Sequence, residues 1–133
     1  MICVPDASAI VEVVLQRSHA GEVAERLSAA EWVTVPTLFA AEVTNTMWKY
    51  HRFQDLPIDV CETAIDDALA IPDTYANDTE LAREAFALGS RIQHPAYDAL
   101  YLVLARRHDG VLLTLDQELR ATARKQSIRV APD

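Results

Sequence analysis

The chain has few of the residues from which several common kinds of functional site are built. Only three of its 133 residues are glycine, so it has no glycine-rich loop of the kind that cradles nucleotide phosphates. Its two cysteines, Cys3 and Cys61, are too few for a disulfide framework, and we expect both to be small core residues in a reducing compartment. The four histidines do not have the spacing of zinc ligands, which argues against a zinc enzyme.

Long apolar segments are also missing. No apolar run approaches the roughly 20 residues that a membrane span needs. The first predicted strand begins at residue 2, which leaves no room for a signal peptide ahead of it, so we expect a cytoplasmic protein. The length and the ordinary balance of apolar and charged residues predict a single domain over residues 1–133.

The charge balance is acidic, with a formal net charge of −8. Such a charge argues against non-specific binding of a polyanion over the whole surface. The basic residues are unevenly spread: Lys49 and Arg52 lie near the end of one predicted helix, and Arg106 and Arg107 near the end of another. They could complement the helix dipoles, or they could guide RNA, and the sequence leaves both interpretations open.

Strands and helices are predicted to alternate along the chain. Apolar runs predict strands over 2–5, 32–35, 111–114 and 127–130, and 70–76 is a poorer strand that Pro72 assigns to a sheet edge. The predicted helices cover 7–16, 19–30, 36–52, 57–69, 95–108, 117–126, and a further segment capped by Asp78 or Thr79 that extends through Ile92. This order predicts an α/β fold with a mostly parallel sheet of about four to five strands, covered on both faces.

Four acidic residues lie where predicted strands end or helices begin. Asp6 and Asp116 follow apolar strands, whereas Glu42 and Asp98 lie in early turns of helices that begin near Pro36 and Pro95. Ligand sites of open α/β sheets form outside the carboxyl ends of the strands. Carboxylates gathered there repel one another unless a cation or protons neutralise them, and oxygen ligands favour Mg²⁺ or Mn²⁺.

Each acid also has a purely structural explanation. Asp6 and Asp116 could cap helices, Asp98 could complement a helix dipole, and Glu42 could pair with Lys49. The joint pattern argues for more, because most of these carboxylates adjoin strongly apolar segments. Asp98 precedes the run 99–105, which must be buried, and no basic residue in its own first turn supplies a partner.

The chemistry that this pattern predicts is hydrolysis of a phosphodiester. A metal ion held by several carboxylates activates water and neutralises charge on phosphate oxygens. Asp6, Glu42 and Asp98 would be the main ligands, and Asp116 would complete the site or orient water. Ser8, Asn45 and Thr114 are candidates for hydrogen bonds to these carboxylates. Lys49, Arg52, Arg106 and Arg107 are hypothesised to flank the groove and steer RNA.

Four segments resemble one known family, the PIN domain, and among PIN domains the VapC-type toxins of toxin–antitoxin pairs. They are 4–11, 41–45, 97–105 and 112–119, in the family's order, and Tyr97-Asp98-Ala99-Leu100-Tyr101 is the most specific. The resemblance implies an α/β/α sandwich and a Mg²⁺-dependent endoribonuclease whose metal ligands are Asp6, Glu42, Asp98 and Asp116. It also implies a homodimer and a cognate antitoxin that blocks the acidic groove.

Three other functions are alternatives to the one that this resemblance implies. A phosphatase of the haloacid dehalogenase type needs a second acid where this chain has Ser8, and Lys125 is poorly placed for its lysine. A response-regulator receiver needs paired acids after the first strand, where Asp6 stands alone. A third alternative is a catalytically silent binding or dimerisation module in which the acids are only structural.

Overall fold

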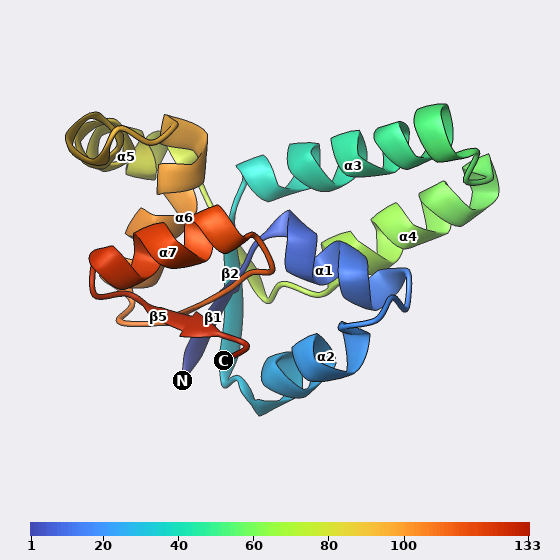
Figure 1. The fold of residues 1–133 in the computed structure, drawn as a ribbon, viewed down its shortest axis with the longest axis horizontal. Coiled ribbons are helices and arrows are strands. Elements are labelled where there is room, and N and C mark those ends of the chain that lie inside the picture. Colours follow the sequence, from blue (N-terminus) through green and yellow to red (C-terminus); the bar gives the residue numbers. More distant parts are fainter.

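The computed structural model describes residues 1–133 and contains five strands and seven helices (Figure 1). The strands are β1 (Ile2–Pro5), β2 (Trp32–Pro36), β3 (Thr74–Ala76), β4 (Val111–Leu113) and β5 (Arg129–Ala131). The helices are α1 (Ala7–Val14), α2 (Ala20–Ala29), α3 (Leu38–Gln54), α4 (Ile58–Ala70), α5 (Asp78–Ile92), α6 (Ala96–Arg107) and α7 (Gln117–Lys125). No helix combines the length and the apolar composition that crossing a membrane requires.

The strands form one sheet in the order β3-β2-β1-β4-β5, and every neighbouring pair is parallel. This confirms the predicted α/β fold. The poor strand expected over 70–76 is the edge strand β3, shortened to Thr74–Ala76, and Pro72 lies outside it. The chain leaves β1 toward β2 on one side and later returns to β4 on the other, so the crevice at the carboxyl ends of β1 and β4 is a topological switch point.

Side chains alternate between the two faces of the sheet and thereby form two apolar layers. Cys3 on β1 packs in a cluster with residues of α1 and α2, and the next residue, Val4, packs on the opposite face with α5, α6 and α7. Figure 1 shows these helices on opposite sides of the strands. The result is the three-layer α/β/α arrangement that the resemblance implied.

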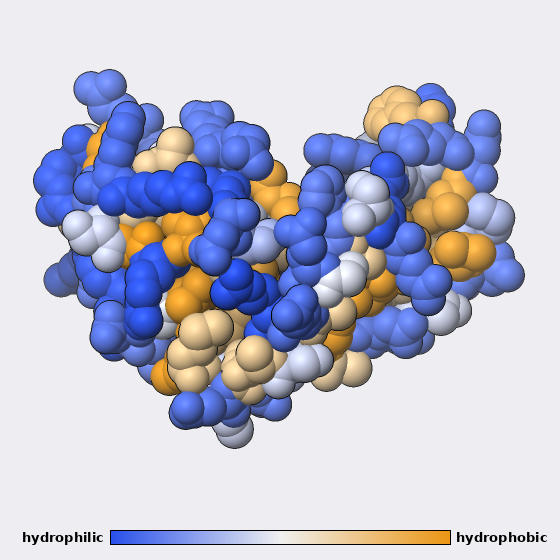
Figure 2. All heavy atoms as spheres, turned by 60° about the horizontal axis from the view of Figure 1, so that its bottom comes forward, coloured by the Kyte–Doolittle hydropathy of each residue, from blue (hydrophilic) through white to orange (hydrophobic).

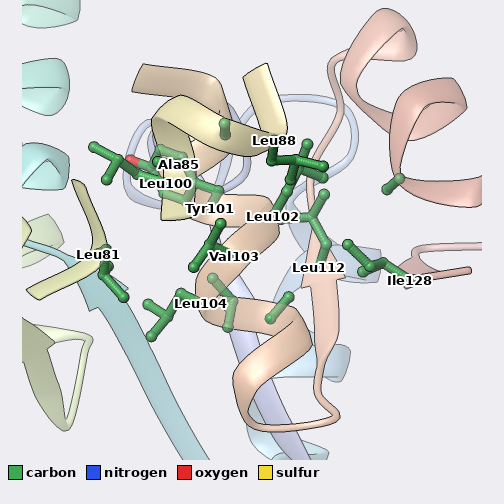
Figure 3. Close-up of a cluster of buried hydrophobic side chains, with 14 of the residues drawn as sticks. Leu81, Ala85, Leu88, Leu100, Tyr101, Leu102, Val103, Leu104, Leu112 and Ile128 are labelled. Carbon is green, nitrogen blue, oxygen red and sulfur yellow. The ribbon is translucent and has the colours of Figure 1, made fainter. Parts of the chain in front are cut away.

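Helix α6 forms the centre of one of these layers. Every residue from Ala99 to Ala105 is buried, as the apolar run predicts. Leu102 and Leu104 pack with Leu81 and Leu88 of α5 and with Leu112 of β4 (Figure 3). Burying one large apolar side chain stabilises a fold by about 1.5–3 kcal/mol, so this helix is held firmly in place.

Helices α3 and α4 form an antiparallel hairpin that projects from the sheet (Figure 1). Asp55 directly follows the last residue of α3, and its left-handed backbone (φ 56°) turns the chain toward α4. Met47 of α3 and Cys61 of α4 pack together with Val11 of α1. Cys61 and Cys3 are both buried and free, as expected, and burial raises the pKa of the Cys3 thiol to about 12.

The predicted helix bounds differ from the structure by two residues at the end of α1 and at both ends of α3, which was expected over 36–52. We expected a helix over 7–16, but α1 ends at Val14. Gln16 has a positive φ of 52°, so the chain turns sharply there and cannot continue the helix.

The contrast between two helical glycines tests the packing of α5 against the start of α6. A Cβ at Gly89 would lie 2.7 Å from the backbone oxygen of His94, whereas a Cβ at Gly21 in α2 would meet nothing within 4 Å. We expect Gly89→Ala to destabilise the protein by about 1–3 kcal/mol through overpacking. Gly21→Ala should stabilise it by about 0.5–1 kcal/mol through helix propensity. Denaturant unfolding would measure both changes, and a neutral Gly89→Ala variant would contradict the tight junction described here.

Candidate functional site

The four acids identified in the sequence lie around one pocket, although they come from four separate segments. The pocket has a volume of about 450 Å³ and is lined by Asp6 at the end of β1, Glu42 of α3, Asp98 of α6 and Asp116 at the start of α7. It lies at the carboxyl ends of β1 and β4, where the sheet topology changes direction. Figure 2 shows the molecule hollowed at one edge between two lobes; by its place in Figure 1, one lobe carries the α3–α4 hairpin and the other carries α5.

Asp6 is the most buried of these acids, with 7% of its surface exposed. One carboxylate oxygen accepts hydrogen bonds from the Ser8 hydroxyl (2.7 Å) and the Ala9 amide (3.1 Å), and the other accepts one from the Thr114 hydroxyl (2.5 Å). Burial raises the pKa of this carboxyl, the hydrogen bonds lower it, and the negative charge of Asp116 raises it further. Asp6 also caps α1 by accepting the hydrogen bond from the Ala9 amide, so one side chain both caps the helix and lines the pocket.

Glu42 is held by an aromatic hydroxyl from another layer of the fold. The Tyr101 hydroxyl donates a 2.5 Å hydrogen bond to Glu42, and only 1% of Tyr101 is exposed. Burial raises the pKa of Glu42, the Tyr101 bond lowers it, and the charges of Asp6, Asp98 and Asp78 raise it. Tyr101 was not among the residues predicted for the site, although it lies three residues after Asp98, which places both side chains on one helix face.

Asp98 has a basic partner just outside its own helix. The Nε2 atom of His94 lies 2.9 Å from a carboxylate oxygen of Asp98, and the His94 side chain is 8% exposed. Because an ionised carboxylate can only accept, Nε2 carries the hydrogen. Burial raises the pKa of Asp98, His94 lowers it through its hydrogen bond and charge, and Asp116 and Glu118 raise it. His94 precedes the first turn of α6, so it was not among the partners of Asp98 considered in the sequence.

Asp116 is satisfied mainly by backbone amides. It caps α7 by accepting hydrogen bonds from the amides of Glu118 (3.0 Å) and Leu119 (3.1 Å). Its own amide donates to the Thr114 hydroxyl, which also donates to Asp6, so Thr114 connects two of the acids. Ser8 and Thr114 thus hydrogen-bond to Asp6, whereas Asn45 lines the pocket without a hydrogen bond to any of the four acids.

The combined arrangement concentrates negative charge in a partly closed space. Three of the four carboxyls have a raised pKa, and in each case neighbouring acids contribute to the shift. The oxygen-only donor set suits Mg²⁺ or Mn²⁺. In the present side-chain positions, no three acidic, histidine or cysteine groups are close enough to hold one ion jointly. Mg²⁺ commonly keeps several waters and uses one or two carboxylates, so the residues fit a hydrated ion.

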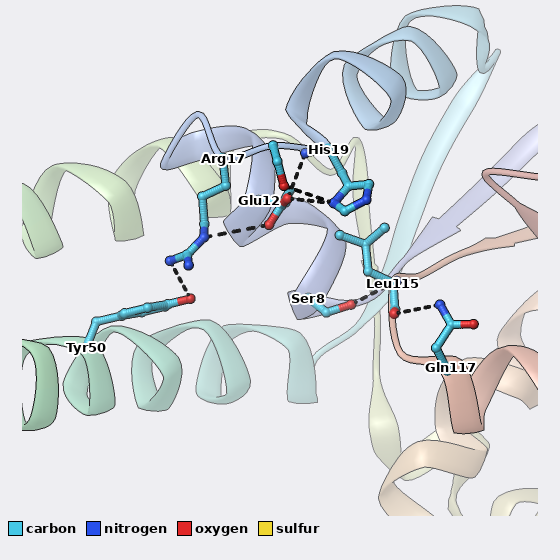
Figure 4. A network of polar contacts seen from close by, with 8 residues as sticks. Ser8, Glu12, Arg17, His19, Tyr50, Leu115 and Gln117 are labelled. Atoms are coloured by element: carbon cyan, nitrogen blue, oxygen red, sulfur yellow. Dashed lines mark hydrogen bonds and ion pairs between the residues drawn. The ribbon is translucent and has the colours of Figure 1, made fainter.

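A polar network connects α1 and α3 beside the pocket (Figure 4). Glu12 accepts hydrogen bonds from the His19 amide (2.8 Å), and its carboxylate lies 3.1 Å from Nδ1 of the His19 ring. Arg17 lies 3.9 Å from Glu12 and donates a 2.8 Å hydrogen bond to the Tyr50 hydroxyl. Glu12 of α1 and Tyr50 of α3 both line the pocket, so the network connects two of its lining residues through Arg17.

The basic residues proposed from the sequence are not all brought to the pocket. Lys49 lines it, and Arg52 lies one turn further along α3, with its guanidinium 5.4 Å from the centre of the Phe53 ring. Arg106 and Arg107 are near the other end of α6 from Asp98, and both pair with Glu84 of α5, at 3.2 and 3.3 Å. Neither of these arginines lines the pocket.

The chain is similar to known proteins over most of its length. The family model for the PIN domain matches residues 3–125. Ribonuclease VapC3 from Pyrobaculum aerophilum is 33% identical over 125 residues, which covers 90% of this chain and 92% of that protein.

Three solved structures share the fold. PAE2754 from Pyrobaculum aerophilum aligns with a TM-score of 0.71 and 22% identity, covering 91% of this chain and 86% of that one. VapC20 from Mycobacterium tuberculosis, described as a toxin that cleaves the sarcin–ricin loop, aligns with a TM-score of 0.67 and 15% identity. The alignment covers 92% of this chain and 95% of that one. VapBC2 from Rickettsia felis, solved with a DNA fragment from its promoter, aligns with a TM-score of 0.67 and 13% identity, covering 98% of both chains.

The raised carboxyl pKa values predict how stability depends on pH. Between the unfolded and folded pKa values the folded protein binds more protons, so its free energy of unfolding falls as pH rises through that interval and is flat above it. Asp98→Asn removes one such group while keeping an oxygen that accepts from His94. We expect its melting temperature to exceed that of the wild type at pH 7, with the difference vanishing below about pH 4, the unfolded carboxyl pKa.

Melting curves of both proteins from acidic to neutral pH would measure this effect. Asp66→Asn is a matched control, because Asp66 is exposed on α4 and does not line the pocket. A lower melting temperature for Asp98→Asn at pH 7 would contradict the destabilising effect of burial and of neighbouring negative charge on the Asp98 carboxylate.

Proposed function

Because the chain belongs to the PIN domain family, we propose that it is a metal-dependent endoribonuclease that acts as the toxin of a toxin–antitoxin pair. The observation that carries this proposal is the meeting of four carboxylates from four separate segments around one pocket. The likeness to a VapC ribonuclease over nine-tenths of the chain supports it. The reaction would be hydrolysis of RNA phosphodiester bonds.

The proposed cofactor is Mg²⁺, for which Mn²⁺ can substitute, held by Asp6, Glu42, Asp98 and Asp116 directly or through water. When bound, such an ion supplies a nucleophile from water at neutral pH and neutralises charge that develops on the phosphate. The oxygen-only donor set and the mutual repulsion of the acids support this choice.

The surrounding residues would orient the carboxylates. Ser8 and Thr114 restrain Asp6, Tyr101 restrains Glu42, and His94 restrains Asp98. Carboxylates aimed in this way need little reorganisation when an ion and a phosphate arrive, which is the usual role of hydrogen bonds behind a metal site. Asn45 has no such bond but lines the pocket, where its amide is available to substrate.

Lys49 and Arg52 are proposed to steer the RNA backbone toward the acidic pocket. Neither is engaged in an ion pair, and Lys49 lines the same pocket as the four carboxylates. The proposal has less support for Arg106 and Arg107, since Glu84 neutralises part of their charge away from the pocket.

The family likeness also supports a protein partner, an antitoxin that covers the acidic groove, because one structural neighbour is a VapBC assembly. A homodimer and a cytoplasmic location, where cellular RNA is accessible, complete the proposal. The alternative of a silent binding module receives some support from the capping roles of Asp6 and Asp116, which would persist without catalysis.

Metal binding separates these two possibilities without knowledge of the RNA target. We expect the purified protein, freed of any partner, to bind Mn²⁺ saturably, and we expect both Asp6→Asn and Asp98→Asn to weaken binding about 10–100-fold. Electron paramagnetic resonance of free Mn²⁺ would measure the affinity of each protein for the ion. Asp66→Asn on α4 should bind like the wild type.

Cleavage of total cellular RNA gives the second readout in the same variants. Asp98→Asn should reduce Mg²⁺-dependent cleavage by at least roughly a hundredfold, the usual scale for losing a group that acts in the reaction. Full metal-dependent cleavage by folded Asp98→Asn would contradict the assignment of this residue. Wild-type protein that neither binds Mn²⁺ nor cuts RNA would favour the binding module.

The salt dependence of RNA binding tests the proposed steering residues. Each lysine or arginine that neutralises a phosphate contributes a little under one unit to the slope of log affinity against log salt. Lys49→Gln should therefore flatten that slope by about 0.7 for single-stranded RNA. Arg107→Gln is the matched control and should leave it nearly unchanged, because Arg107 pairs with Glu84 away from the pocket. Equal slopes for wild type and Lys49→Gln would remove Lys49 from the RNA path.

A further inference from the structure

A second hollow lies on α3 beside the carboxylate pocket, and it contains the indole of an exposed tryptophan. We call it the Trp48 surface; its lining consists of Ala40, Ala41, Thr44, Asn45 and Trp48, around a volume of about 640 Å³. Trp48 is 55% exposed, and the alanines beside it are small. One face of a large aromatic ring is thus accessible to a flat ligand.

A neighbouring aromatic ring supports the orientation of this indole. Phe53, also exposed, meets Trp48 edge to face, with ring centres 5.9 Å apart and an interplanar angle of 88°. This geometry is favourable between aromatic rings and restrains the indole. The Arg52 guanidinium lies 5.4 Å from the centre of the Phe53 ring, so a cation adjoins the aromatic pair.

Two cations adjoin the Trp48 surface of this acidic protein. Lys49 and Arg52 flank Trp48 without an acidic partner. Five of the other nine arginines pair with acids: Arg17, Arg26, Arg106, Arg107 and Arg129. Aromatic faces interleaved with free cations are the usual composition of sites for single-stranded nucleic acid.

The Trp48 surface is continuous with the carboxylate pocket. Asn45 lines both hollows, and Trp48 follows it by one helical turn. Glu42 and Trp48 are six residues apart on α3, which corresponds to about 9 Å along the helix axis. A chain whose phosphate lies at the carboxylates can therefore place a nearby base over the indole.

We propose that the Trp48 surface binds an unpaired nucleobase of the RNA substrate by stacking on the indole, while Lys49 and Arg52 contact the adjoining phosphates. This inference rests on the proposed nuclease function and adds to it a requirement for single-stranded RNA beside the cleaved bond. Stacking tolerates any base, because every base has an aromatic face. Asn45, at the junction, is placed to hydrogen-bond to the nucleotide between the two hollows.

Charge favours RNA over a second copy of this chain as the occupant. In a two-fold dimer the same surface faces itself. Lys49 and Arg52 of one copy would then lie opposite the same cations of the other, without acids on this surface to neutralise them. RNA phosphates supply that neutralisation, and the base covers the indole.

Tryptophan fluorescence tests the proposal, because the chain has only two tryptophans. Trp32→Phe retains Trp48, and Trp48→Phe retains Trp32, which begins β2 at the opposite end of the strand from the pocket. Both are made in the Asp98→Asn background so that the RNA stays intact. We expect single-stranded oligoadenylate, in the presence of Mg²⁺, to quench only the protein that retains Trp48. An abasic oligomer with the same ribose-phosphate backbone should cause no quenching.

Affinity gives the second measurement. Trp48→Ala should weaken binding of oligoadenylate by roughly tenfold or more and leave binding of the abasic oligomer unchanged. Trp48→Phe keeps an aromatic face and should restore most of the affinity. Because Trp48 is exposed, its replacement should not prevent folding, and melting curves would verify this.

Several results would overturn the proposal. They are equal quenching of both tryptophans, equal loss of affinity for both oligomers, or no loss for either. A dimer in sedimentation that Trp48→Ala converts to monomer would assign the surface to a second copy instead. If the wild-type protein neither binds Mn²⁺ nor cuts RNA, the nuclease proposal itself fails, which is a different result from RNA binding without a contribution from Trp48.

Discussion

Repulsion among carboxylates at the switch point of the sheet is the constraint on which the rest of this site depends. A buried or half-buried carboxylate is costly unless donors compensate it. Here each acid has its own compensation: hydroxyls and an amide for Asp6, a phenol for Glu42, an imidazole for Asp98, and helix amides for Asp116. The donors moderate the cost without removing it, since the pKa values of three acids stay raised. The remaining electrostatic energy is what a bound cation would relieve.

The hydrophobic core is organised so that these groups cannot move apart. Helix α6 is buried along most of its length and supplies both Asp98 and Tyr101, the donor to Glu42. Displacing either side chain would mean displacing a helix packed between α5 and the sheet. Ser8 and Thr114 similarly join the ends of two adjacent strands through Asp6. Packing energy is thereby used to hold like charges close to one another.

The distribution of positive charge explains how an acidic protein can be suited to a polyanion. Half of the ten arginines pair with acids, so these five contribute little to the field beyond their partners. Free cations on α3 adjoin both the carboxylate pocket and the exposed indole of Trp48. Local charge at the groove, rather than the net charge of −8, is therefore the quantity relevant to binding.

The sequence by itself determined the alternation of strands and helices, the burial of 99–105, and the placement of Asp6 and Asp116 after apolar strands. These features depend on local apolar patterns and on the rule that parallel strands end at one edge. The sequence also carried the family motifs. Only the tertiary structure decided which donor satisfies each acid, since the Tyr101–Glu42 bond joins residues 59 positions apart through packing of α6 near α3. It likewise separated Arg106 and Arg107 from the pocket and joined Trp48 to it through Asn45. Such pairings follow from how helices are oriented on the sheet, which local periodicity does not encode.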